Sequence, residues 1–225
     1  MIGALNHVGV ATPSIADSIK LYRDVLGATR IGEPFDLPAQ GVKVCFIDTP
    51  TAQIELIEPY DDTSPIVGFL AKNPNGKIPV LELEDGSCLW ESNAILNYLA
   101  EGSEFLPTDP RLRTQVLQWQ FFEQYSHEPF IAVARYIKVY LGMPEERREE
   151  YEAKQLDGYH ALNVMEQQLL RTPYLVGDHY SIADVALYAY THVAEEGGFD
   201  LGGYPAIRQW LQRVASHPRH VGMYD

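Results

Sequence analysis

Hydrophobic and polar residues follow a strand-like pattern in the first third of the chain. Short apolar runs separated by turn residues predict three strands there, over residues 5–11, 42–48 and 52–58, with a turn at 49–51. Between the first two runs, apolar residues recur at helical spacing from Ile15 to Leu26. Ser14 and Asp17 are a helix-start pair, because such side chains satisfy the first free N–H groups, and Gly27 is a helix stop. The first 70 residues are predicted to have the order β-α-β-β-β, and these runs place three of its four strands.

After residue 74 the pattern changes to a hairpin and then to helices. Two short apolar runs, 78–83 and 87–90, flank a turn at 84–86 and predict the hairpin. Helices are predicted over residues 92–100, over 109–141 with a break near Pro129, over 144–170, and from Ser181 and Pro205 onward. Ser181 with Asp184 is interpreted as a structural helix cap.

The predicted fold class is α+β, in three segments that follow one another without a flexible linker. A βαβββ module is expected over residues 1–72, a ββα segment over 73–102, and an all-helical domain over 103–225. The first border falls at a helix-like stretch, 66–72, which suggests that one module is joined directly to the other.

Composition narrows the classes of function. The 225 residues include 31 acidic and 17 basic side chains, and the net charge of −14 disfavours nucleic acid or an anionic membrane as a partner. Two cysteines cannot form a disulfide framework, no apolar stretch approaches the ~20 residues of a membrane span, and the first residues lack the features of a signal peptide. A soluble, cytoplasmic protein is expected.

Two short motifs after residue 74 contain residues suited to binding a ligand. Pro79 removes a ladder donor beside the hairpin, so the backbone groups of Ile78 are expected to stay available to an extended peptide. Glu91 and Ser92 stand at a predicted helix start, where N–H groups and the helix dipole attract a carboxylate. Glu91 suits an ammonium group beside that carboxylate. The alternative is that Glu91 and Ser92 are a helix cap only.

Residues 73–221 resemble a glutathione transferase from the middle of its N-terminal domain to its end. The likeness rests on three motifs in order, NPNGKIPVL at 73–81, ESNAI at 91–95 and SIAD at 181–184. The resemblance implies a partial thioredoxin-like segment, a cis Ile78-Pro79 bond, and a glutathione site made by Ile78, Pro79, Glu91 and Ser92, with Lys77 near the glycyl carboxylate. It also implies glutathione as co-substrate, a small electrophile as second substrate, and a homodimer.

The first strand and helix of that family, which carry the Ser, Tyr or Cys that activates the thiol, have no counterpart before residue 73. The catalytic residue is therefore not assigned. Binding without efficient conjugation is expected, unless Tyr22, Cys45 or a tyrosine of the helical domain takes the place of that residue. Three further side chains, Tyr125, His127 and Arg135, are candidates to face the pocket of the second substrate.

Residues 1–70 instead resemble the first half of a methylmalonyl-CoA epimerase, of the vicinal oxygen chelate superfamily. The matching stretches are LNHVGVA at 5–11, LYRDVLG at 21–27, QIELIEP at 53–59 and SPIVGFL at 64–70. The resemblance implies that His7 and Glu55 are half of a divalent-metal site, and strand parity predicts that they share one face of a sheet. Two ligands bind a metal weakly, and a two-fold dimer would double them. The alternative is a His and a Glu left over from the parent fold.

These observations leave three hypotheses for function. The preferred one is a glutathione transferase family protein that binds glutathione, with conjugation open because the thiol-activating residue is missing. The second is a metal-dependent epimerase or lyase of the vicinal oxygen chelate type. The third is a chimeric scaffold without catalysis.

Overall fold

The computed structural model describes residues 7–48, 53–73, 75 and 77–222, which form parts of two compact units. The first unit is Met1–Ile95 and the second is Leu96–Asp225. Their border falls inside helix α3, Ser92–Ala100. The three segments expected from the sequence, with borders after residues 72 and 102, stay a prediction, and the turn expected at 49–51 lies outside the described residues.

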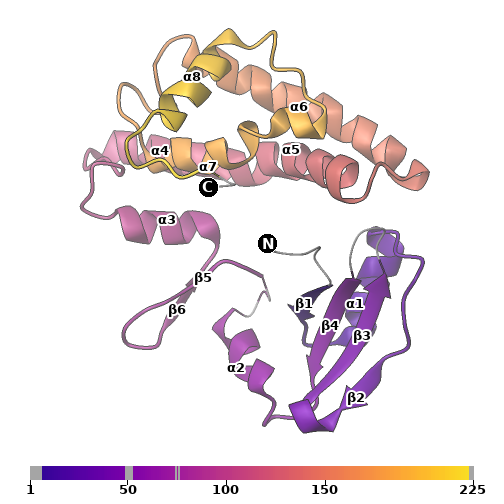
Figure 1. Cartoon of the computed structure of the whole chain (residues 1–225). Coiled ribbons are helices and arrows are strands. Elements are labelled where there is room, and N and C mark those ends of the chain that lie inside the picture. The colour runs from indigo at the N-terminus through magenta and orange to yellow at the C-terminus, as the bar shows by residue number, and fades with distance from the viewer. Residues whose placement is uncertain (1–6, 49–52, 74, 76, 223–225) are drawn as a thin grey trace. The chain divides into compact units, whose positions relative to one another are not determined.

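A four-stranded sheet with one covering helix forms the first part of the N-terminal unit (Figure 1). The strands stand in the order β1 (His7–Ala11), β4 (Gln53–Pro59), β3 (Val42–Asp48) and β2 (Phe35–Leu37). The β1–β4 pair is parallel and the other two pairs are antiparallel. This confirms the predicted βαβββ order. The short strand β2 was not located from the sequence, because its three residues carry two exposed side chains and no buried one.

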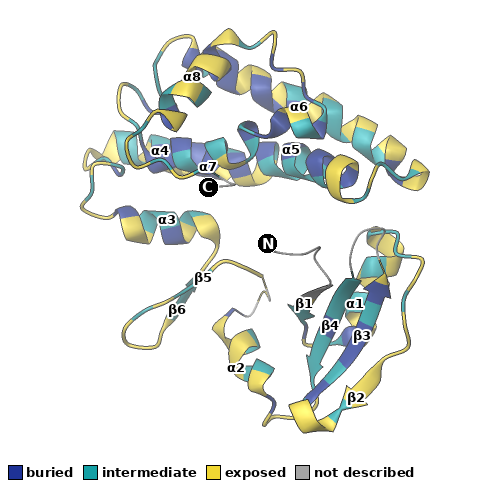
Figure 2. Ribbon diagram, viewed as in Figure 1, coloured by how far each residue is buried: buried dark blue, intermediate teal, exposed yellow. Residues whose placement is uncertain are grey.

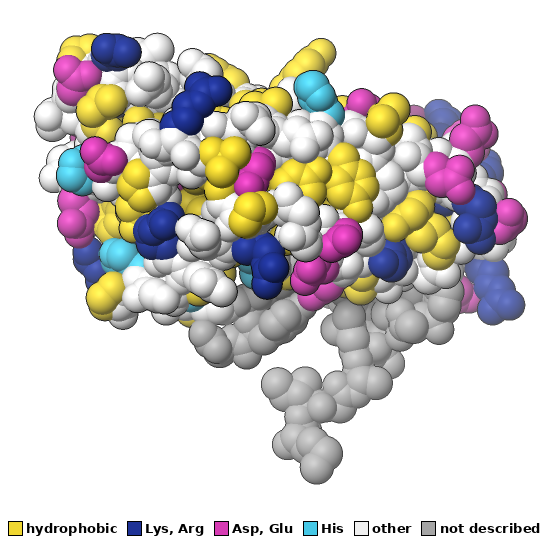
Figure 3. All heavy atoms as spheres, turned by 90° about the horizontal axis from the view of Figure 1, so that it is seen from above, with side chains coloured by type: hydrophobic (Ala, Val, Ile, Leu, Met, Phe, Trp, Pro, Cys, Tyr) yellow, Lys and Arg dark blue, Asp and Glu magenta, His cyan; other side chains and the backbone are white. Residues whose placement is uncertain are grey.

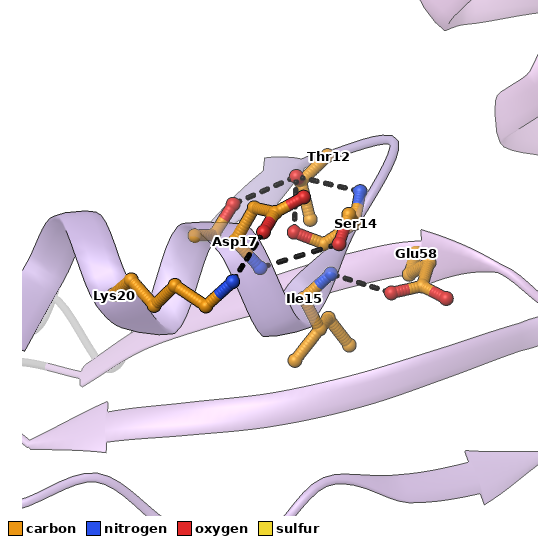
Figure 4. A network of polar contacts seen from close by, with 7 residues as sticks. Thr12, Ser14, Ile15, Asp17, Lys20 and Glu58 are labelled. Atoms are coloured by element: carbon orange, nitrogen blue, oxygen red, sulfur yellow. Dashed lines mark hydrogen bonds and ion pairs between the residues drawn. The ribbon is translucent and has the colours of Figure 1, made fainter.

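Helix α1 (Ile15–Lys20) is fixed to the sheet at its first residue (Figure 4). The Ser14 hydroxyl accepts a hydrogen bond from the Asp17 amide, as the helix-start pair predicts. The Asp17 carboxylate bonds to Lys20 at 2.8 Å. Glu58 of β4 accepts from the Ile15 amide at 2.5 Å, so a strand carboxylate caps the helix from outside. Ile15 then packs against a small core that includes Cys45, Ile47 and Leu56.

The remainder of the N-terminal unit has a helix and a hairpin. Helix α2 (Pro65–Lys72) confirms the helix-like stretch at the predicted border. Strands β5 (Val80–Glu82) and β6 (Cys88–Trp90) pair antiparallel, which confirms the hairpin, and α3 follows it directly. The Ile78-Pro79 peptide bond is cis, as predicted.

The C-terminal unit is all-helical and holds the larger core. Its helices are α4 (Pro110–Phe122), α5 (Glu128–Arg135), α6 (Arg148–Leu169), α7 (Ile182–Thr191) and α8 (Pro205–Ala215). Figure 2 shows that buried residues gather on these helices, and Trp210 and Phe199 are the largest fully buried side chains. On the face seen in Figure 3, hydrophobic side chains are interspersed with acidic and basic ones. Among the described residues, no helix has the length and apolar character needed to cross a membrane.

The predicted cap of α7 is confirmed in full. The Ser181 hydroxyl accepts from the Ala183 amide, and the Asp184 carboxylate accepts from the Ser181 amide at 2.9 Å. Asp184 also accepts from the Leu175 amide and from the Trp210 indole. Burial raises the pKa of the Asp184 carboxyl, while these hydrogen bonds oppose the rise. The pair is structural, as predicted.

The long helix predicted over 109–141 is interrupted by π-helical turns. Glu123–His127 separates α4 from α5, next to the predicted break at Pro129, and Tyr136–Tyr140 follows α5. A π-turn shifts the following side chains around the helix axis, so positions after it leave the face that a 3.6-residue period assigns. The helical spacing alone therefore mislocates side chains beyond residue 122.

Candidate functional site

The hairpin brings the two predicted binding motifs to one end of a two-stranded sheet. Val80 pairs with Trp90, so Pro79, just before β5, and Glu91, just after β6, both adjoin the first rung of the ladder. At the other end the chain reverses around Asp85, whose carboxylate accepts from the Ser87 hydroxyl and amide. These bonds hold the pKa of the Asp85 carboxyl below its usual range. Strand pairing thus joins residues 12 apart in the sequence into one candidate site.

Glu91 has an unusual backbone at the start of α3. Its φ is +68°, in the left-handed region that few residues other than glycine adopt. Its carbonyl accepts from the Ile95 amide at 3.0 Å, so Glu91 is the residue that begins the helix. Such a conformation costs about 1–3 kcal/mol and is enriched at functional sites. The exposed side chains of Glu91 and Ser92 stand together at the first turn, whose N–H groups have no acceptor inside the helix.

Two asparagines that sequence reasoning missed shape the loop before the hairpin. Asn73 is only 4% exposed, and its side chain donates to the Lys77 carbonyl and accepts from the Asn75 amide. The Asn75 side chain donates to Glu91 Oε1 at 3.4 Å. These bonds tie the segment that carries Lys77 to the start of α3. Asparagines beside Pro and Gly are a known turn signal and would have pointed to this loop.

Ile78 offers the backbone amide and carbonyl that pairing with an extended peptide requires. Its side chain is 83% exposed. Within the described part of the chain, no hydrogen bond joins its amide or carbonyl to another backbone group. An extended peptide laid beside Ile78 would therefore find one donor and one acceptor there.

The candidate metal residues lie on neighbouring strands. The register of β1 and β4 pairs His7 with Gln53 and Gly9 with Glu55, so positions 7 and 55 are two residues apart on adjacent strands, as predicted. The His7 side chain lies outside the described part of the structure. Among the described residues, no group of three or more His, Cys, Asp or Glu side chains is arranged to hold a metal ion.

Several sequence candidates for the thiol and the second substrate are wrong. Cys45 is fully buried in the sheet core, and burial raises the pKa of its thiol, so it cannot serve as the donor to a bound thiol. His127 is also fully buried and bonds to Thr191 at 2.8 Å. Arg135 is buried and paired with Glu196 at 2.7 Å. His127 and Arg135 each have a partner distant in sequence, which helical spacing does not reveal.

Comparison with known proteins finds a family match for each of the two parts of the chain. The family model for the N-terminal domain of glutathione S-transferase matches residues 57–101, and the one for its C-terminal domain matches 131–218. A glutathione S-transferase structure from Pseudomonas fluorescens is 71% identical, covers 77% of this chain and 87% of its own, and superposes with a TM-score of 0.70. The chain belongs to the glutathione S-transferase family. The disulfide-bond oxidoreductase YfcG of Escherichia coli is 32% identical over 67% of this chain and 72% of its own length.

A second glutathione transferase structure that resembles this chain contains bound glutathione. The glutathione transferase of Burkholderia graminis, solved with two glutathione molecules bound per subunit, is 27% identical with a TM-score of 0.60. It covers 69% of this chain and 69% of its own.

The N-terminal part of the chain matches a second family. The model of the glyoxalase, bleomycin resistance protein and dioxygenase superfamily covers residues 6–78. The ethylmalonyl-CoA/methylmalonyl-CoA epimerase of Cereibacter sphaeroides is 48% identical over 38% of this chain. The aligned part of this chain spans 64% of that epimerase. Both resemblances found in the sequence are confirmed, and the two families follow one another in one polypeptide.

Proposed function

We propose that the chain binds glutathione at the end of the β5–β6 hairpin where Pro79 and Glu91 meet. The observation that carries the proposal is the Val80–Trp90 pairing, which joins the cis-proline motif to a strained glutamate at a helix start. The Glu91 carboxylate accepts a hydrogen bond from the γ-glutamyl ammonium of glutathione, and the Ser92 hydroxyl donates one to the neighbouring γ-glutamyl carboxylate. The Ile78 backbone pairs with the cysteinyl peptide, and Lys77 lies toward the glycyl carboxylate. Glutathione bound in a family relative supports the same ligand here.

Binding without efficient conjugation is the expected behaviour. Conjugation needs a donor near the sulfur that favours the thiolate, and each unit of thiol pKa corresponds to about 1.4 kcal/mol. The segment that supplies this donor in the family is replaced by the βαβββ module. The contacts proposed here address the γ-glutamyl and backbone groups of glutathione instead of its sulfur.

Calorimetry with glutathione tests the site directly. Glu91→Gln keeps the side chain's size but removes its charge, so binding should weaken about tenfold, at the low end of what a lost charged hydrogen bond costs. Glu84→Gln, on the exposed hairpin turn, is the matched control and should bind as the wild type does. Ser92→Ala should weaken binding less than Glu91→Gln. Absence of binding by the folded wild type, or an unaffected Glu91→Gln, would contradict the proposal.

An aryl-halide assay tests the absence of efficient conjugation separately. We expect glutathione conjugation close to the uncatalysed rate in the wild type. Robust turnover would show that another side chain, such as Tyr22, replaces the missing donor. Light scattering in solution would test the expected homodimer.

A second candidate function is a metal-dependent epimerase or lyase, favoured by the superfamily match over residues 6–78 and by the β1–β4 register. The described residues of one chain form no group of three or more His, Cys, Asp or Glu side chains that would hold a metal, and a catalytic metal site usually needs at least three protein ligands. No catalytic step is therefore derived. Calorimetry with Co²⁺ tests the candidate: tight binding that is lost in His7→Gln would support a site completed by a second chain, and no binding would remove it.

A further inference from the structure

A cavity of about 740 Å³ lies within the helical unit, between α3, α7 and the segment that follows α8. Apolar side chains form part of its lining, among them Leu96 and Ala100 of α3 and Ile182 and Val185 of α7. Pockets for small molecules measure roughly 300–1,000 Å³ and are largely apolar. None of the lining residues belongs to the proposed glutathione site, so the cavity has no assigned ligand.

Aromatic and imidazole rings line much of this cavity. They are contributed by Phe105, Tyr180, Tyr188, His192, His217 and His220. The rings already contact one another: Tyr188 stacks on His192 with centroids 4.7 Å apart and planes 2° from parallel. Tyr180 lies 5.2 Å from the His217 ring. Ring faces and edges of this kind favour a flat aromatic guest over a flexible aliphatic one.

The charge of the lining differs from that of the chain. The sequence holds 31 acidic residues, yet none of those that the structure describes lines the cavity, whereas Arg219 does. Arg219 pairs with Glu104 outside the lining at 2.7 Å. Both side chains of that pair are about 70% exposed, so the ion pair is weak and an anion can compete for the guanidinium.

Two phenol groups add hydrogen-bond donors to the cavity. Burial and the nearby Asp184 charge raise the pKa of Tyr180 to about 12, so its hydroxyl keeps its proton at neutral pH. Burial raises the pKa of Tyr188 as well. Within the described residues, no hydrogen bond joins either hydroxyl to another group. A cavity with apolar and ring walls, one guanidinium and two phenol donors is complementary to a flat ring that carries a single anionic group.

We propose that this cavity binds an aromatic carboxylate, with the ring against the aromatic and apolar lining and the carboxylate at Arg219. The site lies outside the proposed glutathione site and does not depend on glutathione binding. Its occupant is a small molecule of the size and charge of 2-naphthoate.

Calorimetry on the full chain tests the proposal with 2-naphthoate and with its uncharged analogue 2-naphthalenemethanol. Wild type should prefer the carboxylate. Arg219→Gln should weaken 2-naphthoate binding about tenfold and leave the alcohol unchanged, because only the charged contact is lost. Ala189→Trp places a large ring at an exposed lining position and should abolish binding of both. Arg113→Gln is the matched control, since it removes the same charge from another exposed ion pair of this unit and should change neither.

Three results would overturn the proposal. The first is no 2-naphthoate binding to the wild type at millimolar concentration. The second is equal affinity of wild type and Arg219→Gln for 2-naphthoate, which would place the anion elsewhere. The third is displacement of 2-naphthoate by saturating glutathione, which would make the two sites one. Circular dichroism of each variant confirms that a loss of binding is not a loss of fold.

Discussion

His127 should make the helical unit sensitive to mild acid. Its ring is fully buried, and burial lowers the pKa of the imidazole from 6.5 to about 3. The Thr191 hydroxyl donates to the Leu187 carbonyl at 2.6 Å, so His127 Nε2 must carry the proton that joins it to Thr191. Nδ1 has no hydrogen-bond partner among the described residues. The folded protein therefore holds this histidine neutral.

The sign and size of the effect follow from proton linkage. Below pH 6.5 the unfolded chain takes up a proton at this residue, whereas the folded chain takes none until about pH 3. Unfolding then binds a proton, so the free energy of unfolding falls as the pH falls through this window. At pH 5, one and a half units below the unfolded value, the loss is about 2 kcal/mol.

Urea unfolding of wild type and His127→Gln at pH 7 and pH 5 measures this loss. Glutamine can donate to Thr191 as Nε2–H does but does not titrate, so the variant should lose about 2 kcal/mol less than wild type between the two pH values. His160→Gln, which removes an exposed imidazole from α6, is the control and should behave as wild type. Equal losses in wild type and His127→Gln would refute the argument. An NMR titration of the His127 ring, expected to be flat down to pH 5, gives a second reading.

Two further predictions concern hydrogen bonding and packing. Glu166 is only 7% exposed, and its carboxylate accepts hydrogen bonds from two backbone amides at the start of α8, at 3.0 and 2.9 Å. Glu166→Ala should therefore lower the free energy of unfolding, measured by urea titration, by about 3 kcal/mol. Glu149→Ala, at an exposed position of α6, is the control and should change it little. A Cβ on Gly158 would stand 2.4 Å from the buried Phe199 ring, so Gly158→Ala should destabilise by about 2 kcal/mol. Gly68→Ala in α2, with open space around it, should instead stabilise slightly, and thermal unfolding that ranked the two glycine variants the other way would contradict this account.

Local signals predicted the elements well. The caps at Ser14 and Ser181 involve residues within a few positions of one another, so their chemistry can be recognised in the sequence. The hairpin and its neighbours followed from two apolar runs around a turn. The motifs at Ile78 and Glu91 were found from local chemistry and resemblance, and strand pairing supplied their proximity.

Interactions between distant residues account for what the sequence missed. His127 and Arg135 were expected to face a pocket, but their partners Thr191 and Glu196 lie more than 60 residues later. The π-helical turn at Glu123–His127 changes the facing of side chains without any change in composition. The cap on α1 from Glu58 depends on a strand that returns 43 residues after Ile15. Such features require the folded chain.

The border of the two units inside α3 limits how the protein can be divided. A fragment that began at Leu96 would keep only the last five residues of the helix and would lack Glu91, whose carbonyl receives the Ile95 amide. So short a helix does not form on its own in water. Yet Ala100 and Leu96 belong to the core of the helical unit. Gene dissection should therefore cut before Glu91, and a helical fragment made this way carries Glu91 and Ser92 of the proposed glutathione site with it.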